Sequence, residues 1–574
     1  MNLLSINTIF NSIGTTARYN FIKATIILLI AGLLEGVSFG LVFPVLKIIN
    51  GDIPDFIRSM PFVAKYILAV PQAQLLISAA ILLLVVYSLK SAYLLYATRK
   101  QADYIFSTQS ILSSKMLKVY LGQNYEFFVA NNSSSLTRNI LSEVDQFCHT
   151  TLVASSILLS EIIVIFAIGT ALFILNPLAI VVITVVFVFG GYVYNAILKN
   201  KNKEYGNYRQ KAEGDRLKTV QQIFESIKTV LLNQDTNYWY RRYSENVKVV
   251  STMCSNQYYL VATPRIVTDL LAIITLVMIT VILIVVQHLS LKEAIPILIV
   301  YGGASFRLMP SMTRVSSSIQ SLYFTLPVIN LIAYELRRPV NSHTDINHKN
   351  RVFLKDGISI ENVSYTTQTG KEILKNITIK IPVNSHIGIT GKSGAGKTTL
   401  IDMVAGLLVP TSGIIKIDGI DLKEISSSWS KSIGYVMQNT PILNDSVRSN
   451  IAFGVDVSQI DESRVSDAIR MAGLSEFVSL LPNGVDTLIS ERGGSISGGQ
   501  RQRIGIARAL YTKPQLLILD EGSSALDLET EEELLKNIND LEGLTTLTIA
   551  HRESALKNCT ILIHIEDGNV NIKY

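Results

Sequence analysis

Six long apolar stretches, all before residue 331, constrain the fold of this chain more than any other feature. A helix needs about 20 apolar residues to cross the hydrocarbon core of a bilayer, and each stretch reaches that length. The sequence therefore predicts an all-helical membrane domain with six spanning helices. They are expected at roughly Ile22–Leu46, Gln74–Ala97, Leu152–Leu175, Leu178–Leu198, Ile266–Gln287 and Ala294–Leu322.

Basic residues gather in two loops of this half, after the second stretch and after the fourth. Positively charged loops stay on the cytoplasmic side of a membrane. The chain is therefore expected in the cytoplasmic (inner) membrane, with both loops and the N-terminus in the cytoplasm. Much of the net charge of +6 falls in short segments beside apolar stretches, which indicates a membrane protein, and no nucleic-acid partner is expected. No cleavable signal peptide is expected before the first stretch.

Both loops are too long to be simple connectors and keep a helical periodicity, so we expect helices that project beyond the membrane. Each helix pair ends in an aromatic tip, near Gly122–Phe128 and near Leu231–Tyr240. Such tips suit docking onto another domain, although an ordinary amphipathic helix end has the same composition.

The composition changes at 336–350, a polar segment interrupted by Pro339. After it, strand-like runs alternate with helix-like runs, which is typical of an α/β domain. We therefore predict a transmembrane domain over 1–335, a linker over 336–350 and an α/β domain over 351–574.

A glycine-rich segment in the α/β domain matches G-x-x-x-x-G-K-[ST]. It lies between a strand-like run, His386–Thr390, and a helix-like run, Thr399–Leu407, which is the context that a phosphate-binding loop (P-loop) needs. Its glycines let backbone N–H groups surround phosphates, its lysine reaches the β- and γ-phosphates, and its threonine can ligate Mg²⁺. With ATP and Mg²⁺ as the expected ligands, the predicted nucleotide-binding residues are Gly391, Lys392, Ser393, Gly394, Ala395, Gly396, Lys397, Thr398 and Thr399.

The run Leu516–Asp520 predicts an apolar strand that ends in an acid, and Glu521 follows directly. An aspartate at the end of a buried strand can hold Mg²⁺ through its water shell when it follows a P-loop. The next carboxylate can orient or deprotonate the attacking water. We therefore predict that Asp520 binds the metal and that Glu521 is catalytic.

The order of these and further motifs resembles that of the ATP-binding cassette (ABC) transporters. The further motifs are Gln438 in YVMQ, ISGGQ at 496–500, SALD at 524–527 and His551 in TIAHR. With six apolar stretches in front, the chain resembles an ABC exporter half-transporter over nearly its whole length. The resemblance implies that Gln438 senses Mg²⁺ and the attacking water, that His551 contacts the γ-phosphate, and that Asp527 belongs to the nucleotide site.

In this family the ISGGQ segment caps the ATP that a second, facing domain holds on its P-loop. The resemblance therefore places Ser497, Gly498, Gly499 and Gln500 on the γ-phosphate of a facing copy, at a helix N-terminus whose dipole favours negative charge. One chain has one half of each site and must dimerise. Because neither catalytic motif is degenerate, a homodimer with two competent sites is expected.

Two positions depart from the family pattern. The signature begins with Ile496 in place of the usual leucine, and Thr367 occupies the position of the aromatic residue that stacks on adenine. Tyr365, two residues earlier, is retained as a nucleotide-binding candidate, with packing as a strand residue as the alternative. The C-terminal helical tail of many relatives is expected to be short or absent.

Ionisable residues inside membrane spans are costly and usually face a cavity or a partner. Arg307 and Arg314 are seven residues apart, so both lie on one helix face. Because the arginine fork binds phosphate bidentately, we predict that they line a cavity for an anionic amphiphile, with Glu35 and Lys90 as further candidates. In the alternative interpretation, Lys90, Arg265 and Arg314 snorkel or form structural pairs.

The predicted function is ATP-driven export or flipping of an amphiphilic substrate by a membrane homodimer, with membrane lipids as its surroundings. The stretches LLEGVSFGLVFP and ASFRLMPSMTR are similar to the exporter subgroup that flips lipid-linked oligosaccharides or exports glycolipids. A peptide or hydrophobic-drug exporter is the main alternative, and an ATP-gated channel or regulator is a further one. Six fused spans exclude a soluble ABC ATPase and disfavour an importer, whose parts are usually separate chains.

Overall fold

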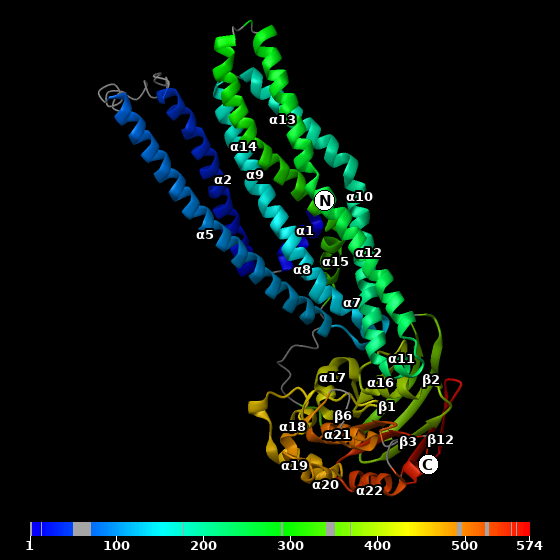
Figure 1. The fold of residues 1–574 in the computed structure, drawn as a ribbon. Coiled ribbons are helices and arrows are strands. Elements are labelled where there is room, and N and C mark those ends of the chain that lie inside the picture. The colour runs from blue at the N-terminus through cyan, green and yellow to red at the C-terminus, as the bar shows by residue number, and fades with distance from the viewer. Residues whose placement is uncertain are drawn as a thin grey trace. The chain divides into compact units, whose positions relative to one another are not determined.

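Long helices form the first part of the chain in the computed structural model, and a sheet-containing part follows (Figure 1). The chain divides into two compact units, Met1–Leu121 with Asn131–Val340, and Gly122–Ala130 with Asn341–Tyr574. The predicted linker, 336–350, contains that division, and the domain boundaries stay a prediction. The structure describes residues 3–12, 14–49, 71–175, 177–286, 288, 291–339, 351–367, 369–490, 496–522, 527–550, 552, 554–557 and 559–573.

The first unit consists of helices and short connections in the residues described, with no strand among them. Its α-helices are α1 (Leu3–Ser12), α2 (Thr15–Ile49), α5 (Gln72–Leu121), α7 (Ser133–Arg138), α8 (Val144–Gln146), α9 (Val153–Leu175), α10 (Pro177–Glu225), α11 (Ile227–Leu232), α12 (Thr236–Ala262), α13 (Pro264–Val281), α14 (Leu291–Phe324) and α15 (Leu326–Leu336). Stretches of π-helix occupy Asn139–Glu143, Phe147–Leu152 and Ile282–Val286.

Five helical segments among the described residues are long and apolar enough to cross a membrane. A sixth is added if the bent pair Leu308–Phe324 and Leu326–Leu336, 51° apart, counts as one span. The prediction of a helical membrane region is therefore confirmed, with five or six candidate spans among the described residues. The helices also run well past the apolar stretches, because α5 has 50 residues and α10 has 49. At 1.5 Å per residue each is about 75 Å long, whereas the bilayer core is about 30 Å thick.

Two glycines let α2 approach α9 closely. A Cβ at Gly36 would collide with the side chain of Ala167, and one at Gly32 would lie 2.9 Å from the carbonyl oxygen of Ser160. Small residues spaced four apart are a common basis of helix packing in membranes, where lipid tails provide no hydrophobic driving force. Gly32 and Gly36 are therefore packing residues between two spanning helices.

The second unit is built on sheets. Its antiparallel sheet has the strand order β2-β1-β4-β5, its larger sheet has the order β12-β11-β3-β10-β9-β6, and β7 pairs with β8. The larger sheet is parallel except for its edge strand β12. The strands are β1 (Gly357–Thr366), β2 (Glu372–Pro382), β3 (His386–Gly391), β4 (Ser412–Ile417), β5 (Ile420–Asp421), β6 (Ile433–Val436), β7 (Asp445–Ser446), β8 (Leu488–Ile489), β9 (Leu516–Asp520), β10 (Thr545–Ile549), β11 (Ile561–Glu566) and β12 (Asn569–Lys573). The helices are α6 (Tyr125–Ala130), α16 (Lys397–Val404), α17 (Leu422–Trp429), α18 (Val447–Ile451), α19 (Glu462–Met471), α20 (Ser475–Ser479), α21 (Gly498–Tyr511) and α22 (Leu528–Asn539).

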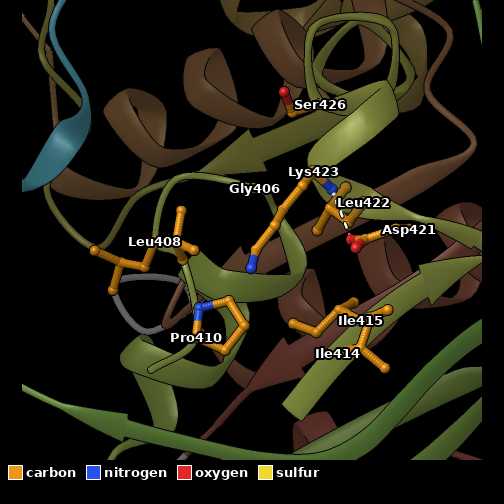
Figure 2. A pocket seen from close by; sticks show the side chains of 10 residues that line it. Gly406, Leu408, Pro410, Ile414, Ile415, Asp421, Leu422, Lys423 and Ser426 are labelled. Atoms are coloured by element: carbon orange, nitrogen blue, oxygen red, sulfur yellow. Dashed lines mark hydrogen bonds between the residues drawn. The ribbon is translucent and has the colours of Figure 1, made fainter. Parts of the chain in front are cut away.

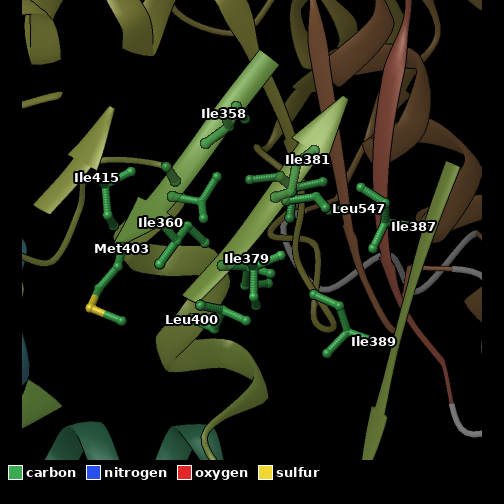
Figure 3. Close-up of a cluster of buried hydrophobic side chains, with 14 of the residues drawn as sticks. Ile358, Ile360, Ile379, Ile381, Ile387, Ile389, Leu400, Met403, Ile415 and Leu547 are labelled. Atoms are coloured by element: carbon green, nitrogen blue, oxygen red, sulfur yellow. The ribbon is translucent and has the colours of Figure 1, made fainter. Parts of the chain in front are cut away.

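Figure 3 shows the apolar core that joins the two sheets. Ile360 and Ile379 from the antiparallel sheet and Ile389 and Leu547 from the parallel sheet meet Leu400 of α16, all at most 3% exposed. Each fully buried side chain of this kind stabilises the fold by about 1.5–3 kcal/mol. Because β3 enters the glycine-rich loop and α16 leaves it, this core fixes both ends of the loop.

Candidate functional site

The glycine-rich loop curls around its own lysine. Gly391, Gly394 and Gly396 have φ angles of 144°, 79° and 104°, a backbone region that other residues rarely adopt. Lys397 is 7% exposed, and its ammonium donates to the carbonyl oxygens of Gly391 at 2.9 Å and Lys392 at 3.0 Å. The N–H groups of the loop and the N-terminus of α16 thus form a cradle that favours a phosphate. Ser393 and Ala395 lie in this loop and Thr399 in α16.

Thr398, Gln438 and Asp520 line one cavity of about 540 Å³. Burial and the charge of Glu521 raise the pKa of Asp520, while the ammonium of Lys397 and a hydrogen bond with Thr398 act in the opposite direction. A hydroxyl, an amide and a carboxylate offer the oxygen ligands that Mg²⁺ prefers. The donor set therefore fits one Mg²⁺ ion.

Glu521 is held in an unusual conformation directly after Asp520. Its φ is 51°, its N–H donates to the carbonyl of Ile549 at 3.1 Å, and its carbonyl accepts from Nε2 of Gln502 at 3.2 Å. Nε2 of Gln438 donates to its carboxylate at 2.6 Å. Residues other than glycine with positive φ store about 1–3 kcal/mol of strain and cluster at functional sites. The fold thus brings together Gln438 and Glu521, two of the three predicted catalytic residues, the third being His551.

The ISGGQ segment forms the start of α21. Oγ of Ser497 accepts from the N–H of Gln500 at 3.1 Å, and Oε1 of Gln500 accepts from the N–H of Ser497 at 2.8 Å, a capping box. Ser497 and Gly498 are exposed, whereas Ile496 packs against a buried cluster. Among the described residues, no hydrogen bond joins this segment to the P-loop of the same chain. The helix end is therefore open to an anion from outside.

Asp527 and Tyr365 have structural partners. Asp527 caps α22 by accepting from the N–H and the hydroxyl of Thr530, at 3.0 and 2.9 Å. Tyr365 is half-buried on β1, and its hydroxyl donates to Glu126 of α6 at 3.2 Å. The hydroxyl of Thr367 is hydrogen-bonded within the turn between β1 and β2. Contact of Tyr365 or Asp527 with a nucleotide stays a prediction.

Three of the sequence predictions fall outside the described residues. They concern His551, the 523–526 segment that contains most of the SALD motif, and the side chain of Arg307.

A polar cluster in the P-loop cavity was not predicted from the sequence. Tyr435 of β6 donates its hydroxyl to Oδ1 of Asp402 on α16 at 3.0 Å, and Tyr125 of α6 lines the same cavity. Burial raises the pKa of Asp402 to about 6; the hydrogen bond from Tyr435 opposes this shift and the charge of Asp520 adds to it. The sequence feature that could have indicated this cluster is Asp402, an acid within the apolar run that follows the P-loop.

A second cavity, of about 200 Å³, lies between the end of α16 and the start of α17 (Figure 2). Leu408, Pro410 and Ile415 line it, and the side chain of Lys423 extends across it. Its lining is mostly apolar and includes none of the predicted nucleotide-binding residues. This cavity is therefore distinct from the one beside the P-loop.

Arg314 of the first unit is paired within the helix bundle. Its Nε donates to Oε1 of Glu161 on α9 at 2.5 Å. The ammonium of Lys90 lies 5.0 Å from the centroid of the Tyr87 ring, and Glu35 is half-buried on α2. Arg314 thus forms the kind of structural pair that the sequence offered as the alternative, and the substrate cavity stays a prediction.

Two family models match the chain, one for the ABC transporter transmembrane region over residues 22–306 and one for the ABC transporter over residues 374–524. The chain is 28% identical over 466 residues to an ATP-dependent lipid A-core flippase of Ralstonia nicotianae, an alignment that covers 80% of this chain and 78% of the relative. It is 40% identical over 220 residues to the cyclolysin secretion/processing ATP-binding protein CyaB of Bordetella pertussis, which covers 38% of this chain but only 31% of that relative. A bacterial Atm1-family ABC exporter with ATP bound shares the fold, with a TM-score of 0.79 at 19% identity over 96% of this chain and 94% of the other.

Proposed function

The chain belongs to the ABC transporters, as a multi-pass exporter that hydrolyses ATP, and from that premise we propose that it acts as a homodimer that flips a phosphorylated amphiphile. Residues 1–335 would form the transmembrane domain and 351–574 the nucleotide-binding domain. The charge bias of the loops supports a cytoplasmic N-terminus and nucleotide-binding domain in the inner membrane.

The exposed start of α21 is the observation that carries the homodimer. Ser497 and Gly498 are exposed, and in the described residues the capping bonds of this segment are internal rather than to the P-loop. A helix N-terminus attracts an anion, and the P-loop at Lys397 is a second such surface. A nucleotide between two copies engages both surfaces, and a twofold axis repeats the arrangement to give two identical sites.

ATP would be bound by the P-loop of one copy and the signature of the other. Lys397 and the loop N–H groups hold the β- and γ-phosphates, while Ser497 and the glycine N–H groups of the facing copy hold the γ-phosphate. Mg²⁺, when bound, neutralises phosphate charge at Thr398, Gln438 and Asp520. ATP binding thus favours the closed dimer over the open one because only the closed dimer makes both sets of contacts.

Hydrolysis would depend on Glu521. Its carboxylate orients the attacking water and accepts its proton. The hydrogen bond from Gln438 supports this assignment, since it fixes the carboxylate beside the cavity that contains Asp520. His551 is proposed from the family resemblance to contact the γ-phosphate.

Similarity through both units supports a lipid-like substrate. The alignment with the Ralstonia nicotianae flippase covers 466 residues, more than either unit contains, so it extends into the membrane helices. Arg314 suits a phosphate, because its fork binds oxyanions bidentately. The alignment with the secretion protein of Bordetella pertussis spans 220 residues, which is short enough to fit within one unit. It therefore supports a substrate class less strongly than the longer alignment does, and export of a peptide is the second candidate.

Reconstitution into proteoliposomes tests this proposal. We expect a phosphorylated glycolipid to stimulate ATP hydrolysis and to be flipped, and we expect its dephosphorylated form and a peptide to do neither. Stimulation by the peptide alone would contradict the substrate class. Full-speed hydrolysis by a strict monomer would contradict the homodimer.

A further inference from the structure

The backbone of Glu521 is held on both sides of its Cα. Its N–H donates to the carbonyl oxygen of Ile549 on β10 at 3.1 Å, and its carbonyl oxygen accepts from Nε2 of Gln502 on α21 at 3.2 Å. Because φ and ψ are the rotations on the two sides of Cα, these two bonds together fix the direction in which the carboxylate leaves the backbone. The φ of 51° requires such support, since a residue other than glycine stays in this region only where its surroundings hold it there.

Of these two bonds, only the one from Gln502 depends on a side chain. Gln502 is 5% exposed, so its amide reaches Glu521 from within the domain. The residue after Glu521 is Gly522, and glycine allows the peptide between them a wider range of rotation than any other residue does. Without the amide of Gln502, this peptide loses a donor that holds its orientation.

The helix that carries Gln502 is pressed directly onto neighbouring segments of the domain. A Cβ at Gly505 of α21 would collide with the side chain of Thr440, and a Cβ at Gly434 of β6 would lie 2.9 Å from the carbonyl oxygen of Ala509 on α21. Contacts this close leave the helix little freedom to shift, because packed interiors do not deform continuously. α21 is therefore a rigid base from which Gln502 reaches the end of β9.

We propose that Gln502 is a positioning residue for hydrolysis, because its amide keeps the carboxylate of Glu521 where Gln438 donates to it at 2.6 Å. The inference rests on the proposed function, in which Glu521 orients the attacking water and α21 caps the ATP of the facing copy. Gln502 follows Gly498 by four residues, about one helical turn. The helix whose first turn serves the site of the facing copy thus positions, one turn later, the carboxylate that serves the site of its own chain.

Steady-state ATP hydrolysis by the full-length protein in proteoliposomes tests the role of Gln502. Gln502→Met keeps the length of the side chain and removes the amide. We expect kcat to fall about tenfold, which corresponds to one hydrogen bond of about 1.4 kcal/mol, and we expect the KM for ATP to stay that of the wild type. Gln459→Met is the matched control, because it removes an exposed amide from the same unit, and it should hydrolyse ATP like the wild type.

Folding and ATP binding are controlled in a background that does not hydrolyse ATP. Glu521→Gln/Gln502→Met should retain ATP through gel filtration as well as Glu521→Gln does, because the amide acts on the carboxylate and not on the nucleotide. An unchanged kcat in Gln502→Met, a raised KM, or lost retention in the double variant would overturn the proposal. Normal turnover by Glu521→Gln would instead contradict the proposed function, so the two failures are separate results.

Two matched heterodimers show which of the two sites Gln502 serves. In the first, one chain carries Gln502→Met and the other carries Glu521→Gln. Its one remaining Glu521 belongs to the chain without Gln502, so hydrolysis should fall about tenfold relative to a heterodimer of the wild type with Glu521→Gln.

In the second heterodimer, one chain carries both changes and the other is wild type. Its one remaining Glu521 belongs to the wild-type chain, and the changed chain supplies only the signature, so hydrolysis should equal that of the reference heterodimer. A loss confined to the second heterodimer would show that Gln502 acts through the ATP of the facing copy. That result, or equal rates in the two heterodimers, would overturn the proposal.

Discussion

Replacing Arg209 with methionine should destabilise the helical unit more than any exposed substitution. Arg209 of α10 donates through Nη2 to Oε2 of Glu143 at 2.8 Å, and the two side chains are 8% and 0% exposed. Gln210 donates to the same oxygen at 3.3 Å, and Nε of Arg138 lies 3.8 Å from Oε1. Glu143 itself lies in the π-helical stretch Asn139–Glu143.

The magnitude follows from this geometry. Two unit charges 2.8 Å apart attract by about 6 kcal/mol at an effective dielectric of ~20, part of which offsets their desolvation. Removing Arg209 leaves the buried Glu143 with one cation, Arg138, at 3.8 Å, so the cost approaches that of breaking a buried pair, about 3–5 kcal/mol. Arg209→Met should therefore lower the apparent unfolding temperature by on the order of 5–10 °C. Glu143→Gln should have a similar effect.

The double variant Glu143→Gln/Arg209→Met is the decisive control, measured by thermal unfolding in the same detergent. Because apolar or neutral groups can replace a buried ion pair at little cost, the double variant should recover most of the lost stability. A double variant that loses as much stability as the two single variants together would refute the reasoning. A wild-type unfolding temperature for Arg209→Met would refute it as well.

Three further predictions concern catalysis, pH and packing. Glu521→Gln should bind ATP but hydrolyse it at least about 100-fold more slowly, so that ATP stays bound through gel filtration. Burial raises the pKa of Asp402 to about 6, so the folded state holds this proton more tightly than the unfolded state. In protein free of nucleotide and Mg²⁺, this carboxyl should therefore lower the unfolding temperature as pH rises from about 4 to 6, and Asp402→Asn should flatten that segment. Gly206→Ala should cost at least about 1–3 kcal/mol, because its Cβ would collide with the carbonyl oxygen of Phe324, whereas Gly169→Ala, with open space around it, should be neutral.

Each of these has an outcome that contradicts it. Normal turnover by Glu521→Gln would remove its catalytic role. An unchanged pH profile in Asp402→Asn would show that another group titrates between pH 4 and 6. Equal stability of the two alanine variants would show that α10 and α14 are not in close contact at Gly206.

Local patterns in the sequence predicted the parts of the fold that depend on local physics. Apolar length fixes a membrane helix, so stretches such as Ile22–Leu46 were sufficient to predict the helical domain. The P-loop could be predicted because its backbone adopts positive φ at Gly391, Gly394 and Gly396, where glycine is favoured. The spacing of these glycines is therefore visible in the sequence.

Contacts between distant residues could not be predicted in this way. The Gln438–Glu521 bond joins residues 83 positions apart, and the Glu161–Arg314 pair joins residues 153 apart. Both depend on how helices and strands pack, which no local pattern records. The environment of Asp402 is another example. This acid lies in an apolar helical run, and its hydrogen-bond partner, Tyr435, lies on a separate strand.

Complementation between two inactive chains tests the central claim most directly, namely that each ATP is bound by two copies. One chain carries Lys397→Ala in its P-loop, the other carries Gly498→Asp in its signature, and both carry Glu521→Gln to retain bound ATP. The account predicts that neither homodimer retains ATP, whereas the purified heterodimer does, because one of its sites combines an intact P-loop with an intact signature. Heterodimers that form but retain no ATP would contradict the account.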